Sequence, residues 1–352
     1  MAAVASFFKR SKYTIKGIVK QNHSAAPEGQ LFTKVDPAVD GEDCDHDCST
    51  CTIKYPAKFS IDEEEPLYGH VKGWATHLLV ATGKSDWVRD VADEKGSVME
   101  AVEKASKPSN GRLMLSASNI PTPCHDTNYK EPTTCLLLPA FTIIENVTPA
   151  NVPDLITSVV DSAPTTTSPL LGRGNANESE TYGSLNGLKI SSGLSTRACP
   201  HGAVILLCSQ KTRDARCGQS APLLKREFER HLRPLGLYRD FEDERPGGVG
   251  IFFISHVGGH KFSANVMIYR RAGFGRSSLL ENGGVRATET NQIDITEAEL
   301  RDAGASQCIW LARVRPEDCE GIINFTVMQG KVVKPERQLR GGFDREKELC
   351  SW

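Results

Sequence analysis

The chain has 352 residues, enough for about two domains, and 39% of them are hydrophobic, which is sufficient for packed cores. Its formal net charge of −2 gives no electrostatic basis for binding nucleic acid, and no stretch approaches the roughly 20 apolar residues that span a membrane. The 11 cysteines, without a secretory signal, favour a reducing compartment, where cysteines more often bind metals or carry redox chemistry than form structural disulfides.

The N-terminal segment is basic. Residues 1–27 contain no acidic side chain, and their basic residues lie among apolar and aromatic ones: Lys9, Arg10, Lys12, Lys16 and Lys20. We therefore expect a disordered basic tail over residues 1–40. The alternative is a mitochondrial presequence in residues 1–27, which would place the protein in the mitochondrial matrix.

Three cysteines follow this tail in a C-x3-C-x2-C pattern that encloses His46: Cys44, Cys48 and Cys51. Radical SAM enzymes share the spacing, but they usually carry an aromatic residue beside the last cysteine, and the sequence here is C-S-T-C. Two interpretations remain open. The cysteines form a second metal site, completed by His46, Cys124 or His125, or they lie in a loop as free thiols.

The first half of the chain, residues 41–162, alternates strand and helix patterns. We predict a strand from His77, a helical run that ends at Ala105, strands over 112–116 and 135–144, and a helix over 152–160. Residues 163–198 are rich in Thr, Ser, Gly and Asn, so we expect a flexible linker there.

The second half, residues 199–335, repeats this outline. We predict strands over 203–207, 249–254, 262–269 and 308–314, and helices over 221–232 and 316–324. Strands that alternate with helices indicate an α/β fold. Residues 336–352 are rich in charged residues, and we expect a C-terminal tail.

Two pairs of metal-ligating residues follow predicted strands of this half. Cys208 and Cys217 are separated by eight residues, whereas a zinc knuckle typically uses two to four. His256 and His260 enclose Val-Gly-Gly, and the paired glycines favour a loop over a helix. Two thiolates and two imidazoles suit zinc or a [2Fe–2S] cluster, and the long cysteine span favours the cluster.

The sequence contains C-x8-C-G, followed by H-V-G-G-H-K-F and A-N-V-x-x-Y. These motifs resemble those of the fungal sucrase/ferredoxin-like family, whose members are thioredoxin-like ferredoxins. The resemblance implies two thioredoxin-like halves and a [2Fe–2S] cluster held by Cys208, Cys217, His256 and His260 in the second. No C-x8-C occurs in the first half, which we expect to act as a cover or docking surface.

We therefore predict electron transfer or redox sensing, coupled to proton uptake through the imidazoles, with a redox partner that the sequence does not name. This role is electron transfer rather than catalysis of a substrate's conversion. Two alternatives stay open: a structural zinc-binding interaction module, and a thioredoxin-like thiol oxidoreductase that uses Cys208 or Cys217.

The chain ends in Cys350-Ser351-Trp352. A terminal Trp resembles the C-terminal signal of proteins recruited by the cytosolic iron–sulfur assembly machinery, and this implies a cytoplasmic protein. Cys350 departs from the aliphatic residue expected in that signal. The alternative is that Trp352 packs on the body of the protein.

Overall fold

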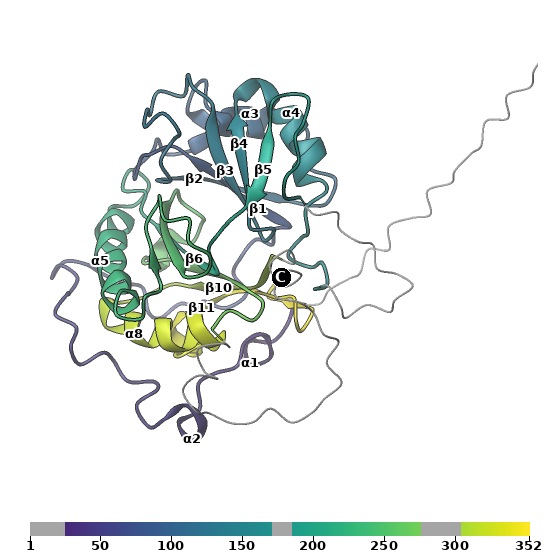
Figure 1. Ribbon diagram of the computed structural model, residues 1–352. Coiled ribbons are helices and arrows are strands. Elements are labelled where there is room, and N and C mark those ends of the chain that lie inside the picture. Colours follow the sequence, from purple (N-terminus) through teal and green to yellow (C-terminus); the bar gives the residue numbers. More distant parts are fainter. Residues whose placement is uncertain (1–24, 171–184, 276–303) are drawn as a thin grey trace, which may run out of the picture.

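The computed structural model describes residues 25–170, 185–275 and 304–352, and its strands form one sheet of twelve (Figure 1). Most neighbouring strands run antiparallel, and the path through the sheet is β12-β11-β10-β9-β6-β8-β2-β1-β3-β4-β5, with β7 beside β8. Strands from both halves of the chain therefore belong to one hydrogen-bonded sheet. The predicted α/β class is confirmed.

In the first half, β1 and β2 are parallel and are connected through helix α3, whereas β3 pairs antiparallel with β1, and β4 pairs antiparallel with β3. A final helical segment changes from α-helix (α4) to π-helix (η3). The bounds are β1 Thr76–Ala81, α3 Val98–Lys104, β2 Leu113–Ser118, β3 Thr133–Leu138, β4 Thr142–Val147, α4 Val152–Asp154, η3 Leu155–Val160 and β5 Ser195–Ala198.

The second half repeats this topology. Strands β6 and β8 are parallel and are connected through the long helix α5, whereas β9 pairs antiparallel with β6, and β10 pairs antiparallel with β9. The bounds are β6 Ala203–Cys208, α5 Ala215–Leu232, β7 Tyr238–Arg239, β8 Val249–Ile254, η4 His260–Phe262, β9 Val266–Arg271, β10 Ala305–Leu311, α8 Cys319–Gly321, η6 Ile322–Val327, β11 Leu339–Asp344 and β12 Leu349–Cys350.

The last helical segments of the two halves show the repeat most closely. Each starts with a 3-10 turn that has a proline at its first position, Pro149–Asn151 in one half and Pro316–Asp318 in the other. Each then has three α-helical and six π-helical residues.

The halves meet where β2 pairs with β8, through Ser118 and Ile254. Corresponding strands thus lie at the junction, as a duplicated unit would place them.

The three largest apolar cores of the described residues follow from the two-residue period of the strands. Leu78 and Val80 of β1 pack toward α3 and α4, whereas Leu79 between them faces the opposite side. In the second half, Ile205 packs with α5, and Leu206 faces the opposite side. Those opposite sides share one core between the halves. Helices α3, α4, α5 and α8 lie at the outside of the molecule (Figure 1).

Several predicted boundaries differ from the structure. The strand predicted over 135–144 is a hairpin, β3 and β4, which turns at Pro139–Phe141. Helix α5 begins at Ala215 rather than at residue 221, because the Asp214 side chain caps it by accepting from the Arg216 backbone N–H. Gly218 and Pro222 lower the helix propensity of its first turns, which hid this start in the sequence.

The predicted tails and linker also contain ordered elements. Two short helices, α1 (Glu28–Leu31) and α2 (Pro37–Asp40), follow residue 24, and Leu31 is buried in the core. Residues 185–198 include β5, and residues 336–352 include β11 and β12. Apolar side chains such as Phe343 pack these segments against the sheet, so the expected C-terminal tail is wrong. Residues 1–24, and with them most of the predicted presequence, lie outside the described residues, as do residues 171–184 in the middle of the predicted linker.

No helix in the described part of the chain is both long and apolar enough to cross a bilayer.

Candidate metal centre

The predicted ligands lie at the carboxyl ends of two neighbouring parallel strands. Cys208 is the last residue of β6, and His256 follows β8 after one intervening residue. Because β6 and β8 are parallel and Cys208 pairs in register with Ile254, both strands end at the same edge of the sheet. The apolar runs that form the strands therefore bring the cysteine and the histidine together.

Cys217 reaches the same edge from the first turn of α5. The segment between the cysteines is a short turn rather than a long loop, because residues 215–217 are already helical. A side chain at Gly218 would come within 2.6 Å of the Lys211 side chain, so this close packing explains why glycine follows the cysteine. The positive end of the α5 dipole points toward the cysteine pair and favours thiolate.

The three donor atoms converge closely. The Sγ atoms of Cys208 and Cys217 are 3.4 Å apart, and Cys208 Sγ lies 3.9 Å from His256 Nδ1. All three ligand atoms lie within 4.8 Å of one another, with both cysteines buried and His256 half-buried. The structure therefore brings three of the four predicted ligands together.

One hydrogen-bond proton lies between the two sulfur atoms. This hydrogen bond, opposed by burial and helped by His256, lowers the pKa of Cys208 to about 5. The same hydrogen bond and burial raise the pKa of Cys217. A cation in place of that proton would let both sulfurs ionise, as metal binding requires.

The donor set fits zinc and iron–sulfur chemistry alike. Bonds of about 2.3 Å to one tetrahedral ion put two thiolates about 3.8 Å apart, close to the separation seen here. One zinc ion meets this requirement, and so does one iron atom of a [2Fe–2S] cluster with both cysteines on it. The buried thiols and the nearby imidazole therefore fit either group.

The loop after His256 depends on two glycines and a buried arginine. Gly258 and Gly259 have φ of 93° and 65°, which L-residues rarely adopt, so the loop prediction is confirmed. The Arg340 guanidinium is 2% exposed and donates to the Gly258 carbonyl at 3.1 Å and to Asn265 Oδ1 at 2.8 Å. It also lies 4.3 Å from the Trp310 ring centroid. Arg340 therefore fixes the loop that carries the histidines.

Segments of the first half cover the cysteine turn. The Gln210 amide donates to the Val88 carbonyl at 2.5 Å, and its Oε1 accepts from the His256 backbone N–H at 2.8 Å. Ser209 donates to the Ser85 carbonyl at 2.7 Å. Gln210 and Arg340 were not predicted from the sequence. Gln210 stands two residues after Cys208, but nothing local marks Arg340, which comes from β11.

His260 begins the 3-10 helix η4, and its side chain lies outside the described part of the chain. Its role as the fourth ligand therefore stays a prediction. The backbone places it four residues after His256, at the far end of the glycine turn.

The structure separates Cys44 from Cys48. Cys44 packs with Val35 and Val333, whereas Cys48 lies 3.9 Å from His231 of α5. His46 is exposed beside Asp43, and Cys124 is exposed. Cys48 instead belongs to a second group of ligand atoms with Glu227 and His231.

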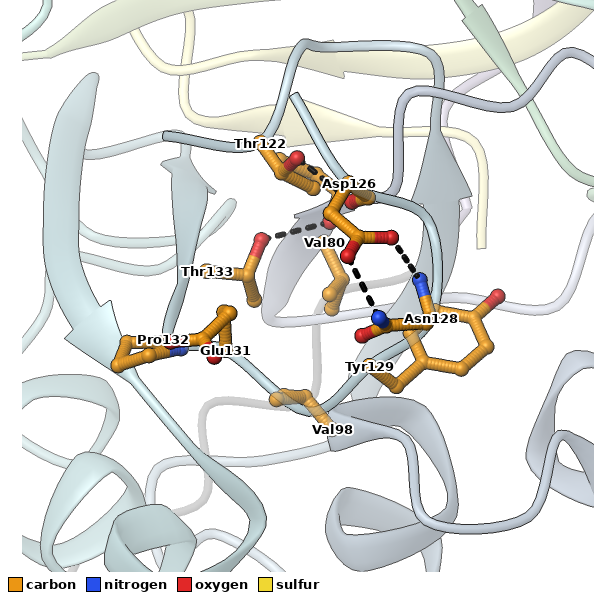
Figure 2. Close-up of a pocket in the computed structure, with 10 residues that line it drawn as sticks. Val80, Val98, Thr122, Asp126, Asn128, Tyr129, Glu131, Pro132 and Thr133 are labelled. Atoms are coloured by element: carbon orange, nitrogen blue, oxygen red, sulfur yellow. Dashed lines mark hydrogen bonds between the residues drawn. The ribbon is translucent and has the colours of Figure 1, made fainter. Parts of the chain in front are cut away.

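Two pockets lie away from the cysteine pair. Figure 2 shows a small one under the turn of Asp126 and Asn128, where Tyr129, Thr133 and Val80 form the walls. Its lining residues, all in the described chain, include neither cysteine nor histidine. A cleft of about 250 Å³ lies between Phe241, Phe252 and the loop before β3. Both are separate from the metal-binding group.

Comparisons with known proteins identify relatives of this chain. A family model described as sucrase/ferredoxin-like matches residues 67–341. Actin patches distal protein 1 of Saccharomyces cerevisiae is 31% identical over 253 residues, which cover 68% of this chain and 75% of that protein. Altered inheritance of mitochondria protein 32 is 28% identical over 131 residues in Meyerozyma guilliermondii, covering 37% of this chain and 32% of that protein. The same protein of Debaryomyces hansenii is 30% identical over 131 residues, again about a third of its length. No solved structure gives a significant match.

Proposed function

The chain belongs to the sucrase/ferredoxin-like family, as its motifs predicted, and from this membership we propose that it is a [2Fe–2S] protein that transfers or senses electrons. The proposed ligands are Cys208, Cys217, His256 and His260. The observation that carries the proposal is the convergence of two buried cysteine sulfurs, 3.4 Å apart, with the His256 imidazole.

When bound, such a cluster accepts one electron, and two neutral imidazoles in place of thiolates raise its potential above the roughly −400 mV of plant-type ferredoxins. The chain's own residues hold the ligands for this role. Gln210 fixes the His256 backbone, and Arg340 fixes the glycine turn. The first half excludes water from the cysteine side through Ser85 and Val88. His256 remains half-exposed, which gives a redox partner an edge to approach.

We also propose that each half is a thioredoxin-like unit. Support comes from the repeated order of strands, with two parallel strands joined by a helix and two antiparallel strands beside them. The shared 3-10, α and π pattern of the last helical segments gives further support. In this view, the first unit lost or never had ligands and serves as the cover of the second.

Purification of the full chain without oxygen tests the cluster. We expect brown protein with about two irons and two sulfides per chain. The matched controls are Cys208→Ser, which removes a proposed ligand, and Cys124→Ser, which removes an exposed cysteine away from the site. Colourless protein, or equal iron in both variants, would contradict the proposal.

The second candidate is a structural zinc centre in an interaction module. The distances among the ligand atoms of Cys208, Cys217 and His256 support a zinc centre, because all three atoms lie within 4.8 Å of one another and suit a single ion. Elemental analysis of the same purified protein distinguishes the two. One zinc bound at Cys208, with neither iron nor sulfide, supports this second candidate.

We propose that the protein works in a reducing compartment, because all eleven cysteines are free thiols in the structure. The cytoplasm is the proposed location, and the mitochondrial matrix is the alternative. Recruitment of the cytosolic assembly machinery through Trp352 stays a prediction. The Trp352 ring packs 4.4 Å from the Trp74 ring centroid, so recognition would require its release. Fractionation of cells that express the tagged full chain tests the location.

A further inference from the structure

A second group of metal-ligating side chains lies at the other end of helix α5. Cys217 is in the first turn of the helix, and Glu227 and His231 are in its last turns. His231 lies 14 positions after Cys217, which corresponds to about 21 Å along the helix axis. This second group is therefore separate from the proposed cluster site.

The second group joins the N-terminal segment to the helix. Glu227 and His231 are four residues apart, so they lie on one face of α5. Cys48 Sγ approaches that face, 3.9 Å from His231 Nε2, and its backbone N–H donates to the Glu317 carbonyl at 2.9 Å. The ligand atoms of Cys48, Glu227 and His231 all lie within 4.8 Å of one another.

Cys51 offers a fourth donor. It follows Cys48 in the C-x2-C spacing of zinc knuckles, and its backbone N–H donates to the Cys48 carbonyl at 3.4 Å. Its thiol donates to the Ile53 carbonyl at 3.4 Å, so the side chain has to turn from that carbonyl to join the other three ligand atoms.

Glu227 is the unusual member of the group. Its side chain is 1% exposed, yet its Oε2 atom has no hydrogen-bond partner among the described atoms. A buried carboxylate oxygen without a donor is costly in a folded protein. The other oxygen, Oε1, accepts from Arg230 Nε at 2.8 Å. A bound cation would give Glu227 Oε2 the partner that it lacks among the described atoms.

Arg230 already places positive charge at this point. Its Nη2 atom lies 2.9 Å from His231 Nε2 and 3.4 Å from Cys48 Sγ, in addition to its contact with Glu227. The side chain is 41% exposed, so it can turn outward to solvent without leaving a buried charge. The three donors thus already surround a cationic group that a metal ion can replace.

We propose that Cys48, Cys51, Glu227 and His231 form a second metal site, suited to Zn²⁺, that binds as Arg230 swings outward. Thiolate sulfur, imidazole nitrogen and carboxylate oxygen all bind zinc, four such donors make a tetrahedral site, and the thiol protons pass to solvent on binding. Bonds of about 2.3 Å to sulfur and 2.0 Å to nitrogen require a separation near 3.5 Å, within half an ångström of the observed one. The site ties the N-terminal segment to the helix that carries Cys217.

The test uses the full chain with Cys208→Ser and Cys217→Ser, so that the first site cannot contribute. Co²⁺ and Zn²⁺ are added separately, and thiolate-to-cobalt absorption and zinc content are measured with a competing chelator present. We expect about one equivalent of either ion. Further substitution of Cys48→Ser or His231→Asn should abolish it, whereas Cys124→Ser should not. Unchanged binding in the Cys48 and His231 variants, or no binding at all, overturns the proposal. A Cys48–Cys51 disulfide in protein purified under reducing conditions overturns it as well.

Arg230→Gln gives a test that does not depend on removing a ligand. If a metal ion takes the place of the guanidinium, this substitution tightens Zn²⁺ binding by at least about tenfold, because a like charge no longer competes. Arg233→Gln, an exposed position on the same helix, should leave the affinity unchanged. Circular dichroism checks that the unaltered protein and both variants are folded. Equal Zn²⁺ affinity in these three folded proteins would show that Arg230 only forms an ion pair, and it would contradict the proposed site. In the unaltered protein, the proposal requires zinc in addition to any metal held by Cys208.

Discussion

His77 should make the folded protein sensitive to mild acid. Its imidazole comes from β1 in the first half and lies fully buried between the halves. Nδ1 is 3.1 Å from the Tyr269 hydroxyl of the second half, and Nε2 is 2.9 Å from Ser116 Oγ. Burial, with a smaller contribution from the Arg112 charge, lowers the pKa of His77 to about 3 from 6.5.

The sign and size of the effect follow from proton linkage. Above pH 6.5 the imidazole is neutral in both states, so its full contribution to stability is present. Between pH 6.5 and about 3, His77 binds a proton in the unfolded chain but not in the folded chain. The unfolding free energy therefore falls as the pH falls through this range. Each pH unit costs about 1.36 kcal/mol, so the loss at pH 5 is about 2 kcal/mol.

Urea unfolding of the metal-free protein at pH 7.5 and pH 5 measures this loss. His77→Gln removes the titrating group, so the decrease in unfolding free energy over that range should be about 2 kcal/mol smaller in the variant. The variant will be less stable at pH 7.5, because it loses contacts to Tyr269 and Ser116, but the comparison uses only the change with pH. His201, whose pKa burial lowers to about 4, contributes equally to both proteins and cancels. Equal decreases in the two proteins would refute the linkage argument.

Four further outcomes are expected. His256→Cys should retain iron but lower the reduction potential in voltammetry, because an anionic ligand replaces a neutral one; an unchanged potential removes His256 from the ligand set. Cys208→Ala should abolish iron and sulfide binding in elemental analysis, and full occupancy contradicts its assignment. Arg340→Met should speed the loss of metal to a chelator by about tenfold or more, since donors to the Gly258 carbonyl and Asn265 disappear; an unchanged rate would show that the turn holds its shape alone. Trp352→Ala should lower the unfolding free energy by about 1–3 kcal/mol through lost packing, whereas lower iron content in cells with unchanged stability favours recruitment.

Local patterns in the sequence identified most of the elements that carry the proposed cluster. The apolar run before Cys208 predicted β6, and the run before His256 predicted β8, because a continuous apolar segment of this length is typical of a strand buried on both faces. The glycine pair between the histidines predicted a loop, and Gly258 and Gly259 have the positive φ that glycine permits. These features depend on neighbouring residues alone.

Long-range packing decided the rest. The segment from residue 336 onward is rich in charged residues, yet it forms the paired strands β11 and β12. Phe343 and Cys350 lie opposite each other in these strands and are buried in the core between the halves. The start of α5 was missed because Gly218 and Pro222 are poor helix formers, and the Asp214 cap and the packing of the helix outweigh them.

The residue types and their spacing identify the side chains that can bind metal and show that strands and helices alternate around them. Which of those side chains meet depends on long-range packing. Cys44 and Cys48 are near neighbours in the chain, but the fold sends Cys44 to Val333 and Cys48 to His231. Arg340 reaches the histidine turn from a strand more than 80 residues away in sequence. The physical reason is that strand pairing and side-chain burial join segments distant in sequence, and no local pattern of residues encodes such contacts.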